Sequence, residues 1–495
     1  MRRSVPLAVF ALLVIAALGD HYFRDEFYYL ACSHRLAWGY VDQPPLSVAV
    51  LWIGRHVAGE SLFTLRVLSA LAAAATIWVT GRLARRLGAS ATGAALAMTA
   101  AAVAPGLLAL GSFYSMNVLD VLVWTLAAWA LLEVLERPTT RGWILLGLVL
   151  GLGLENKISV LWLGAGIGVG LALTPARQLL LTPGPWLAAA VATVLFAPHV
   201  LWQVAHGWPT LEFVRNASRD KMQTNTPVSF LVDQVMNLNP VTLPVWGSGL
   251  AYLLFARDAQ RYRTLGIAFL TVAGILILNR TSRSGYLTPA YPMLFAAGGV
   301  ALERILQRPV LRITAFVVLI AAGAMSAPLA LPLLPTDAYV RYSRALGLAP
   351  GTEEKKDLGR LPQFFADRQG WDRFVDQVAR AMEHVPPAER PAAAVWVGNY
   401  GEAGAIERLG ASRGLVALSG HNNYWLWGPR GYSGDVMIVV TRSRTVLEQR
   451  YASVIQVGET DCGDCMPYEN HVPIFLCRGV VQPLPQRWPL LKHYD

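Results

Sequence analysis

The sequence of 495 residues has few charged residues, few cysteines and no glycine-rich nucleotide-binding loop. Charged residues make up 15% of the chain and hydrophobic residues 54%, whereas soluble domains carry about 25% charged residues. This balance excludes a disordered chain and an ordinary cytosolic enzyme. The 4 cysteines are too few for a disulfide scaffold. No run of Lys and Arg alternates with aromatic residues, so nucleic acid is not an expected partner.

Long apolar runs dominate the first two thirds of the chain instead. About eleven of them predict membrane-spanning helices, because a span needs about 20 apolar residues and only helices cross lipid as separate segments. The runs cover residues 4–19, 61–81, 91–111, 117–135, 142–154, 158–173, 185–204, 241–256, 263–278, 286–302 and 310–328. The first run also fits a signal peptide, but its weak cleavage site favours a retained helix.

The charge of the chain predicts an orientation in the membrane. Residues 336–495 hold equal numbers of basic and acidic residues, so the net charge of +10 lies in residues 1–335. If Arg2 and Arg3 lie in the cytoplasm, alternate loops are short and basic, as the positive-inside rule requires. These loops contain Arg82, Arg85, Arg86, Arg137, Arg141, Arg177, Arg257, Arg261, Arg263, Arg304, Arg308 and Arg312. The outside loops are then residues 20–60, 205–240 and 279–285.

A change of composition predicts two domains, a membrane domain over residues 1–335 and a soluble α/β domain over residues 336–495. An odd number of spans places the second domain outside the membrane. Its expected strands are residues 393–397, 415–418, 436–440, 454–457 and 474–476, with a helix over residues 401–410. Strands that alternate with short helices indicate a partly parallel sheet.

Two adjacent acids, Asp25 and Glu26, follow the first expected span. A carboxylate at an apolar boundary tends toward a raised pKa, which suits a general base. The alternative is a helix cap beside aromatic residues that anchor the loop at the membrane interface. Asp42, later in the same loop, is expected to be a turn residue beside two prolines.

The second outside turn carries Asn117 and Asp120. An acid this close to the membrane core is costly and is a functional candidate by default, although Asn117 can also act as a helix cap. The stretch Glu155–Lys157 interrupts the next pair of apolar runs. Lys157 either pairs with an acid or binds a phosphate, and the sequence favours neither choice.

Two arginines, Arg280 and Arg283, precede the next expected span together with several hydroxyl groups. This composition suits a phosphate clamp, and contact with lipid headgroups is the alternative. In the soluble domain, His421 and Asn422 follow an expected strand, where ligand loops of open α/β sheets lie. Packing of that loop explains its composition nearly as well.

The sequence Cys462–Gly463–Asp464–Cys465 is an isolated pair of cysteines. Outside the membrane it predicts a disulfide, with Cys477 as a further partner to consider, rather than a metal site completed by His471. No residue set forms a firm metal site, so no cofactor is predicted, and dependence on a divalent metal stays open.

The chain resembles the bacterial polyprenyl-phosphate-sugar-dependent glycosyltransferases of the GT-C fold, which include the protein mannosyltransferase and lipid A aminoarabinose transferase families. The resemblance covers roughly residues 1–335 and rests on four segments. These are Asp25–Glu26, the turn Ser115–Asp120, the stretch Gly151–Lys157 and the segment Tyr286–Pro292. The tail resembles one found on a bacterial branch of this family.

The resemblance implies a multi-pass protein of the bacterial inner membrane that moves a sugar from a polyprenyl-phosphate carrier to an acceptor hydroxyl with inversion. The acceptor would be an envelope lipid, glycan or protein. Asp25 would be the general base with Glu26 in support, and Asp120 would be a further acid at the site. Lys157, Arg280 and Arg283 would hold the donor phosphate, in a substrate site that includes Asn117, Tyr286, His421 and Asn422.

A lipid-linked sugar transporter or flippase is the alternative, and a membrane-anchored sensor is a third reading. Transporters concentrate polar groups and broken helices at the bilayer midplane. This sequence places its acids and bases at the outer ends of the expected spans, which favours chemistry on a lipid headgroup. A sensor would need only one or two spans.

Overall fold

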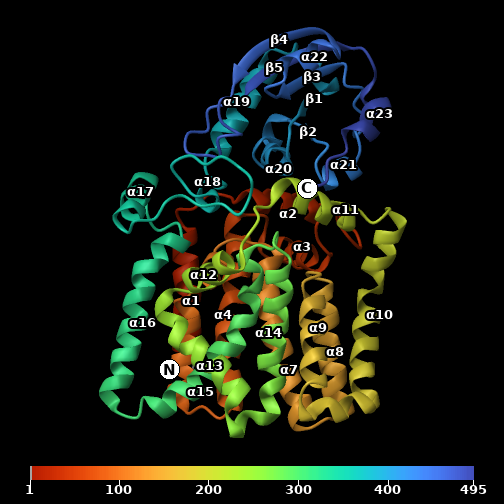
Figure 1. Cartoon of the computed structure of the whole chain (residues 1–495). Coiled ribbons are helices and arrows are strands. Elements are labelled where there is room, and N and C mark those ends of the chain that lie inside the picture. Colours follow the sequence, from red (N-terminus) through yellow and green to blue (C-terminus); the bar gives the residue numbers. More distant parts are fainter. Residues whose placement is uncertain (1–2) are drawn as a thin grey trace. The chain divides into compact units, whose positions relative to one another are not determined.

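The computed structural model describes residues 3–495, so Arg2, expected on the cytoplasmic side, lies outside the described residues. The chain divides into two compact units, each built from three segments (Figure 1). The helical unit consists of the chain up to Gly19, Gln43–His206 and Gln223–Leu334. The sheet unit consists of Asp20–Asp42, Gly207–Met222 and Pro335–Asp495.

Every predicted apolar run forms a helix, or a bent pair of helices, in the helical unit. The helices are α1 (Ser4–Ala17), α3 (Leu46–Ala58), α4 (Leu62–Arg86), α5 (Ala91–Ala102), α6 (Pro105–Gly111), α7 (Met116–Glu136), α8 (Thr140–Leu154), α9 (Val160–Ala172), α10 (Pro183–Ala205), α12 (Pro227–Asn237), α13 (Leu243–Phe255), α14 (Arg263–Leu278), α15 (Tyr291–Ile305) and α16 (Pro309–Ala330). The short segment η1 (Pro175–Leu181) follows α9.

The helices confirm a multispan membrane protein but differ in length from the predicted set. In the described part of the chain, 5 helices are long and apolar enough to cross a membrane, or up to 7 if the bent pairs α5–α6 and α9–η1 are each one span. Several other apolar helices, including α1 and α8, have only 10–17 residues. The expected number of about eleven spans is therefore not reached by length and composition.

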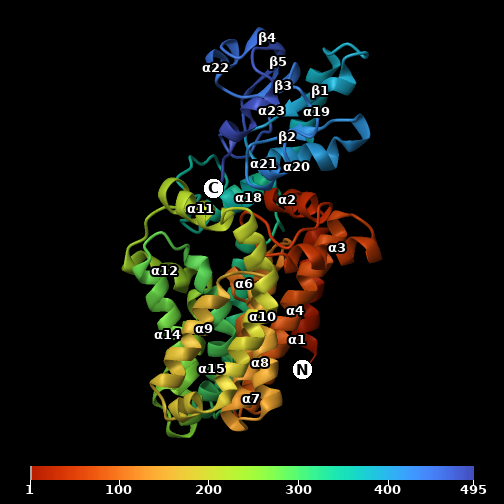
Figure 2. The same cartoon turned by 90° about the vertical axis from the view of Figure 1, so that its right-hand side faces the viewer.

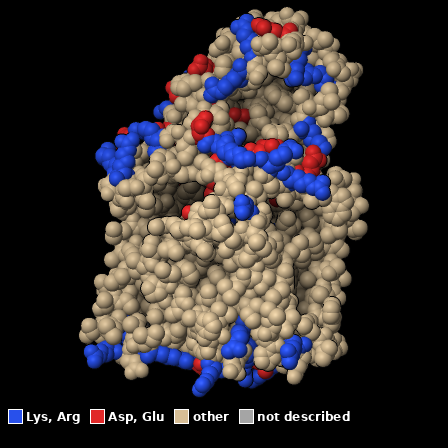
Figure 3. All heavy atoms as spheres, in the orientation of Figure 1, with Lys and Arg blue, Asp and Glu red and all other residues tan. Residues whose placement is uncertain are grey.

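Basic residues gather at one end of the helical unit, below a broad surface without charge (Figure 3). Arg86 at the end of α4 pairs with Glu133 and Glu136 at the end of α7, at 2.5 and 2.8 Å. Arg304 at the end of α15 pairs with Asp258 at 2.6 Å. The alternate basic loops thus share one end of the bundle, as the alternation of charge along the sequence predicts.

Small residues allow neighbouring helices of this unit to approach closely. Figures 1 and 2 show α8 and α10 side by side, and a Cβ atom on Gly147 of α8 would lie 2.6 Å from the carbonyl oxygen of Ala188. Between α13 and α15, a Cβ on Gly298 would lie 1.9 Å from the Val245 carbonyl oxygen. Since lipid tails are as apolar as leucine, such close packing holds membrane helices together.

The sheet unit contains a mixed five-stranded sheet in the order β2-β1-β3-β5-β4. Its strands are β1 (Ala393–Trp396), β2 (Ala417–Leu418), β3 (Val436–Val440), β4 (Tyr451–Glu459) and β5 (Pro473–Val480). Strands β2, β1 and β3 run parallel, and β5 pairs antiparallel with both β3 and β4. The predicted strands and the partly parallel sheet are confirmed.

The helices of the sheet unit are mostly short. They are α2 (Arg24–Ser33), α11 (Pro209–Asn216), α17 (Thr336–Ala345), α18 (Gln363–Ala366), α19 (Trp371–Glu383), α20 (Tyr400–Leu409), α21 (Asn423–Leu426), α22 (Arg444–Glu448) and α23 (Leu484–Arg487). In α19 the residues Phe374, Val375, Val378 and Met382 are buried. This spacing places them on one face of a helix that packs against the sheet.

Two glycines seat α2 against α20, although these helices are far apart in the sequence. A Cβ on Gly401 would lie 2.2 Å from the Cγ of Arg24, and a Cβ on Gly404 would lie 2.7 Å from the Cβ of Phe27. Any larger residue at these positions would push α2 away. The two glycines thereby hold the first turn of α2 at the start of α20.

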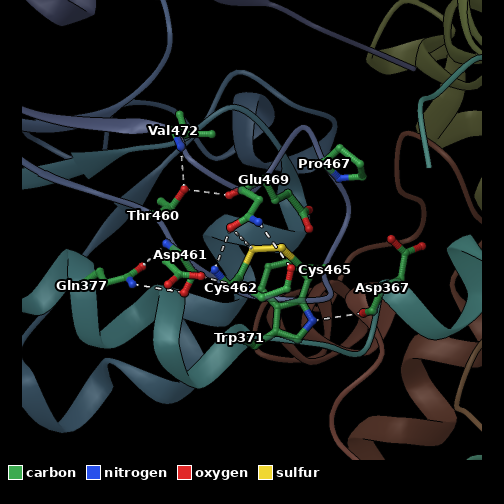
Figure 4. The surroundings of a disulfide bond; sticks show 12 residues. Asp367, Trp371, Gln377, Thr460, Asp461, Cys462, Cys465, Pro467, Glu469 and Val472 are labelled. Atoms are coloured by element: carbon green, nitrogen blue, oxygen red, sulfur yellow. Dashed lines mark hydrogen bonds between the residues drawn. A yellow bond between two sulfur atoms is a disulfide. The ribbon is translucent and has the colours of Figure 1, made fainter. Parts of the chain in front are cut away.

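A disulfide closes a short loop near α19 (Figure 4). Cys462 pairs with Cys465, while the main-chain N–H of Cys462 donates to Asn470 at 2.9 Å. Cys477 is buried in β5 and is a free thiol. The predicted disulfide is present, and Cys477 is not part of it.

Candidate functional site

In the helical unit, a lysine cluster forms where α7 begins and where α8 gives way to α9. We define it as Asn117, Asp120, Lys157, Ser159 and Tyr286. The ammonium of Lys157 donates to the Asn117 side-chain oxygen at 2.8 Å and lies 3.5 Å from the Asp120 carboxylate. It also lies 5.0 Å from the centre of the Tyr286 ring. The structure thus brings together four residues that the sequence singled out in three separate segments.

The acid of this cluster is completely enclosed. The side chain of Asp120 is 0% exposed, and one of its oxygens accepts the hydroxyl hydrogen of Ser159 at 2.9 Å. Its other oxygen is buried without a hydrogen-bond partner among the described residues. Asn156 supports the arrangement, because its side-chain nitrogen donates to the Met116 carbonyl at 2.9 Å. Among the residues that the structure describes, Lys157 is the one cation that forms an ion pair with Asp120.

The two predicted phosphate-clamp arginines lie just before Tyr286 in the chain. The carbonyl of Arg280 accepts from the Asn225 N–H at 2.7 Å, and its side chain is exposed. Arg283 directly precedes η5 (Ser284–Ala290), the short helix that carries Tyr286. Within the described chain, Arg280 forms no ion pair. The structure therefore places Tyr286 in the lysine cluster but leaves Arg280 outside it.

Asp25 lies in the sheet unit, in the first turn of α2. The hydroxyl of Tyr400 donates to its carboxylate at 2.8 Å, and the Arg24 side chain approaches to 3.8 Å. The side chain of Asp25 is 32% exposed, whereas Arg24 is buried and donates to the Tyr468 hydroxyl at 2.5 Å. Asp25 is thus an oriented carboxylate that keeps an open side for a further partner.

The neighbouring acids have different surroundings. Glu26 is completely buried, and its carboxylate accepts the Phe23 N–H at 2.9 Å, as a capping residue does. Asp42 accepts the Tyr28 hydroxyl at 2.9 Å, and burial raises the pKa of Asp42 to about 6. Glu26 therefore matches the helix-cap alternative. Asp42 was expected to be a turn residue, and its carboxylate is shielded from solvent more than that expectation implies.

His421 and Asn422 lie beyond the end of β2 and bind the segment that ends at Asp495. His421 Nδ1 accepts the Tyr400 N–H at 3.2 Å, and Nε2 lies 2.8 Å from the Asp495 carboxylate. The N–H of Asn422 donates to the His493 carbonyl at 2.9 Å. Asn422 is buried, with a φ of 47°, so its role in the structure is to hold this segment in place.

A cavity of about 380 Å³ lies within the sheet unit. It is lined by Arg24, Lys221, Glu354, Lys356, Gly398, Asn399, Tyr400, Glu402, His421, Val440, Thr441, Arg442, Tyr468, Val472, His493 and Asp495. Of the predicted residues, His421 reaches this cavity. Tyr400 both lines it and holds Asp25, which connects the cavity to the candidate base.

The group His421, His493 and Asp495 has potential metal-ligand atoms that all lie within 4.8 Å of one another. Its hydrogen bonds do not suit a metal. Because Nδ1 of His421 accepts a main-chain N–H, the proton of the neutral ring sits on Nε2 and points at Asp495. A metal-bound histidine instead donates from its other ring nitrogen. The group is better described as a carboxylate held between two imidazoles.

Sequence reasoning missed Tyr468 and Asp495, whereas Arg24 and Tyr400 fall within segments that it singled out. Arg24 directly precedes Asp25 in the sequence. Tyr400 lies in a loop that follows a predicted strand, where ligand loops of parallel sheets are expected. Tyr468 and Asp495 carry no signal in the sequence, because their neighbours in the cavity come from distant segments.

Part of the chain is similar in sequence to known glycosyltransferases. Residues 42–202 match the family described as dolichyl-phosphate-mannose-protein mannosyltransferase. The lipid A galacturonosyltransferase RgtD of Rhizobium johnstonii is 26% identical over 199 residues, which cover 39% of this chain and 41% of that protein. The undecaprenyl phosphate-alpha-4-amino-4-deoxy-L-arabinose arabinosyl transferase of Pseudomonas aeruginosa is 31% identical over 180 residues, 32% of each chain. The chain thus matches less than half of either relative's length.

The fold is similar to that of two solved proteins. ArnT from Cupriavidus metallidurans, bound to undecaprenyl phosphate, superposes with a TM-score of 0.66 at 15% identity, over 96% of this chain and 97% of ArnT. An oligosaccharyltransferase from Archaeoglobus fulgidus gives a TM-score of 0.52 at 12% identity, over 83% of this chain and 63% of that one. The chain therefore has an ArnT-like fold, and the family resemblance drawn from its sequence is confirmed.

Proposed function

We propose that this chain, a relative of the lipid-phosphate-sugar-dependent glycosyltransferases, transfers a sugar from a polyprenyl-phosphate carrier to an acceptor hydroxyl on the extracytoplasmic side of the membrane. The family match over residues 42–202 carries the proposal. That segment includes Asn117, Asp120 and Lys157, which are three members of the lysine cluster. The lysine cluster has the chemistry to bind the donor phosphate, and Asp25 has the chemistry to accept the proton of the acceptor hydroxyl.

The lysine cluster supplies the donor side. Lys157 is a cation fixed by Asn117 and Asp120 beside the aromatic ring of Tyr286. A lysine held in this way can contact a phosphate oxygen as a point charge. Arg280 and Arg283 precede Tyr286 and can add charge for the carrier phosphate. These cations would stabilise the negative charge on the departing polyprenyl phosphate and so accelerate its release from the sugar.

Asp25 supplies the acceptor side. The acceptor oxygen forms a bond to the anomeric carbon of the sugar, the bond from that carbon to the carrier phosphate breaks, and the hydroxyl proton passes to the Asp25 carboxylate. Attack on the face opposite the leaving phosphate gives inversion. Asp25 suits this role better than Glu26 does, because Glu26 is buried and already caps α2.

The proposed place of action is the bacterial inner membrane, with about eleven spans and the sheet unit in the periplasm. Shared placement of the basic loops at one end of the helical unit supports this orientation. The acceptor would be an envelope lipid, glycan or protein. A lipid acceptor is favoured because one relative is a lipid A galacturonosyltransferase.

Transfer in detergent solution separates this proposal from a lipid-linked sugar transporter. Purified protein in micelles would be mixed with radiolabelled polyprenyl-phosphate sugars and with envelope lipids, glycans or proteins as acceptors. A transferase moves label to an acceptor without a closed membrane, whereas a transporter needs two compartments. Loss of label from the carrier with the wild type, and not with Lys157→Met, supports the proposal. A carrier that is not consumed by any well-folded preparation, with any acceptor class, contradicts it.

A further inference from the structure

The cavity of the sheet unit lies where the three parallel strands end. Gly398, Asn399 and Tyr400 follow β1, His421 follows β2, and Thr441 follows β3, and all five line the cavity. In open α/β sheets, ligands bind outside the carboxyl ends of parallel strands. The cavity volume of about 380 Å³ lies within the range of small-molecule sites. The position and size of this cavity therefore point to a ligand site.

Four basic residues from four separate segments line this cavity. They are Arg24 in α2, Lys221 at the end of η2 (Ala217–Lys221), Lys356 in the loop before α18, and Arg442 after β3. The Lys356 ammonium lies 5.1 Å from the centre of the Tyr468 ring. Four cations that converge on one cavity favour an anionic ligand.

Arg442 is fixed in place by its own hydrogen bonds. Its guanidinium donates to the main-chain oxygens of His471, Pro467 and Asn470 at 2.8, 3.2 and 2.6 Å. None of these acceptors carries a formal charge, and Arg442 forms no ion pair with a carboxylate in the part of the chain that the structure describes. It is held at the cavity wall without needing to reorganise when a ligand binds.

The acids of the wall are already engaged. Glu402 accepts the N–H groups of Gly398 and Asn399 at 2.9 and 3.2 Å, and burial raises the pKa of Glu402 to about 7. Asp495 lies between His421 and His493, at 2.8 and 3.4 Å. The remaining wall acid, Glu354, is buried. Arg24 also pairs with two acids that do not line the cavity, Asp367 at 3.7 Å and Asp25 at 3.8 Å. The excess of positive charge at the wall therefore rests mainly on Lys221, Lys356 and Arg442.

The uncharged part of the wall is suited to hydroxyl groups. Tyr400 and Tyr468 contribute aromatic rings, and Asn399, Thr441 and His493 contribute polar side chains. Aromatic faces together with amide, hydroxyl and imidazole groups can contact both the carbon skeleton and the hydroxyls of a sugar. The same wall thus has partners for a charged group and for a saccharide.

We propose that this cavity binds an anionic saccharide, a sugar that carries a phosphate or a carboxylate, and that this sugar is part of the acceptor. The proposal rests on the proposed transfer reaction. Tyr400 lines the cavity and donates to Asp25 at 2.8 Å, and Arg24 lines it while lying 3.8 Å from Asp25. A sugar held in the cavity is therefore bound by residues that contact the candidate base.

Equilibrium binding to the full chain in detergent micelles tests this inference apart from catalysis. Isothermal titration calorimetry would compare glucose 6-phosphate, glucuronate, glucose and inorganic phosphate. A phosphorylated disaccharide with and without acyl chains would separate a lipid headgroup from a soluble sugar. We expect both anionic sugars to bind, and glucose and phosphate alone to bind at least 10-fold more weakly, because each lacks half of the contacts.

Charge-reversal variants localise the binding. Lys221→Glu combined with Lys356→Glu should weaken binding of glucose 6-phosphate by about 10-fold or more, since two attractions become repulsions. Lys355→Glu is the matched control, because Lys355 adjoins Lys356 but is exposed and donates to the Arg219 carbonyl instead of lining the cavity. Weaker binding in the double variant, with the control unchanged, supports the cavity as the site.

Several results would overturn the inference. Glucose that binds as tightly as glucose 6-phosphate would remove the need for an anion, and phosphate that binds equally well would remove the sugar. Unchanged binding in the double variant would place the site elsewhere. If the wild type transfers label from the carrier but binds no anionic sugar, this inference fails and the proposed function stands. If it binds anionic sugars but consumes no carrier with any acceptor, the proposed function fails instead.

Discussion

The pair Lys157 and Asp120 gives a prediction that separates a structural role of the lysine from a role in donor binding. In Lys157→Met, the side chain keeps its approximate length but loses its charge. Asp120 is 0% exposed and keeps only the Ser159 hydroxyl as a hydrogen-bond partner among the described side chains. Leaving one member of a buried ion pair uncompensated costs about 3–5 kcal/mol. We therefore expect Lys157→Met to lower the free energy of unfolding by about that amount.

A double-mutant cycle adds the substitution Asp120→Asn, which removes the buried charge. The double variant then carries a neutral buried amide, and an incompletely bonded buried amide costs about 1–3 kcal/mol. The double variant should thus be more stable than Lys157→Met alone, with an interaction energy of about 2 kcal/mol between the two sites. Unfolding in mixed detergent micelles would give the free energy of unfolding of the wild type, the two single variants and the double variant. Strictly additive losses would refute the ion pair.

Binding of undecaprenyl phosphate by the same four proteins addresses function. If Lys157 contacts the carrier phosphate, neither Lys157→Met nor the double variant binds the carrier, even though the double variant is the more stable of the two. Recovery of carrier binding in the double variant would show that Lys157 only neutralises Asp120. Thr125→Ala, which removes a buried hydroxyl of α7 outside the lysine cluster, is a control that should lose about 1 kcal/mol of stability and retain the carrier.

Three further predictions concern the sheet unit. Burial raises the pKa of Glu402 from 4.5 to about 7; the folded chain therefore holds the proton more tightly than the unfolded chain, and stability should fall as pH rises from about 4.5 to 7 by up to about 3 kcal/mol. Glu402→Gln should flatten that part of the stability–pH profile, and an unchanged profile would contradict the assignment. Replacing Cys462 and Cys465 by serine opens a short loop and should cost about 2 kcal/mol in chemical denaturation; no loss would show that the bond does not constrain the unfolded chain. Gly404→Leu should lower the melting temperature of the sheet unit, because the new side chain would collide with Phe27 where α2 packs against α20. The control Arg380→Leu, at an exposed position on α19, should leave the melting temperature nearly unchanged.

The elements of the fold could be predicted because their signals are local. Apolar runs marked every predicted helix of the membrane part, and strands such as Val436–Val440 were recognisable as short runs of β-branched residues. Lengths were less predictable, since α8 ends at Leu154 after 15 residues and the run over 91–111 bends by 68° between α5 and α6. Apolar composition records which segments avoid water and does not record where a helix bends.

The site could be predicted only in part. Asn117, Asp120 and Lys157 were each recognisable as polar groups in apolar surroundings, and the structure brings them together. A helix cap was the alternative that the sequence left open for Asp25 and Glu26, and Glu26 lies in the first turn of α2 as a cap does. The contact between Asp25 and Tyr400 could not have been predicted, because it joins residues far apart in the chain and depends on how α2 packs against α20.

The central claim is that Asp25 takes the acceptor proton during sugar transfer, and Asp25→Asn tests it most directly. The amide oxygen can still accept from Tyr400, so folding and carrier binding should persist. Transfer of radiolabelled sugar from a polyprenyl-phosphate carrier should fall by about 100-fold to 10,000-fold, while Asp372→Asn, an exposed change on α19, should leave it unchanged. Transfer by Asp25→Asn at the rate of the wild type would contradict the account and assign the proton to another group.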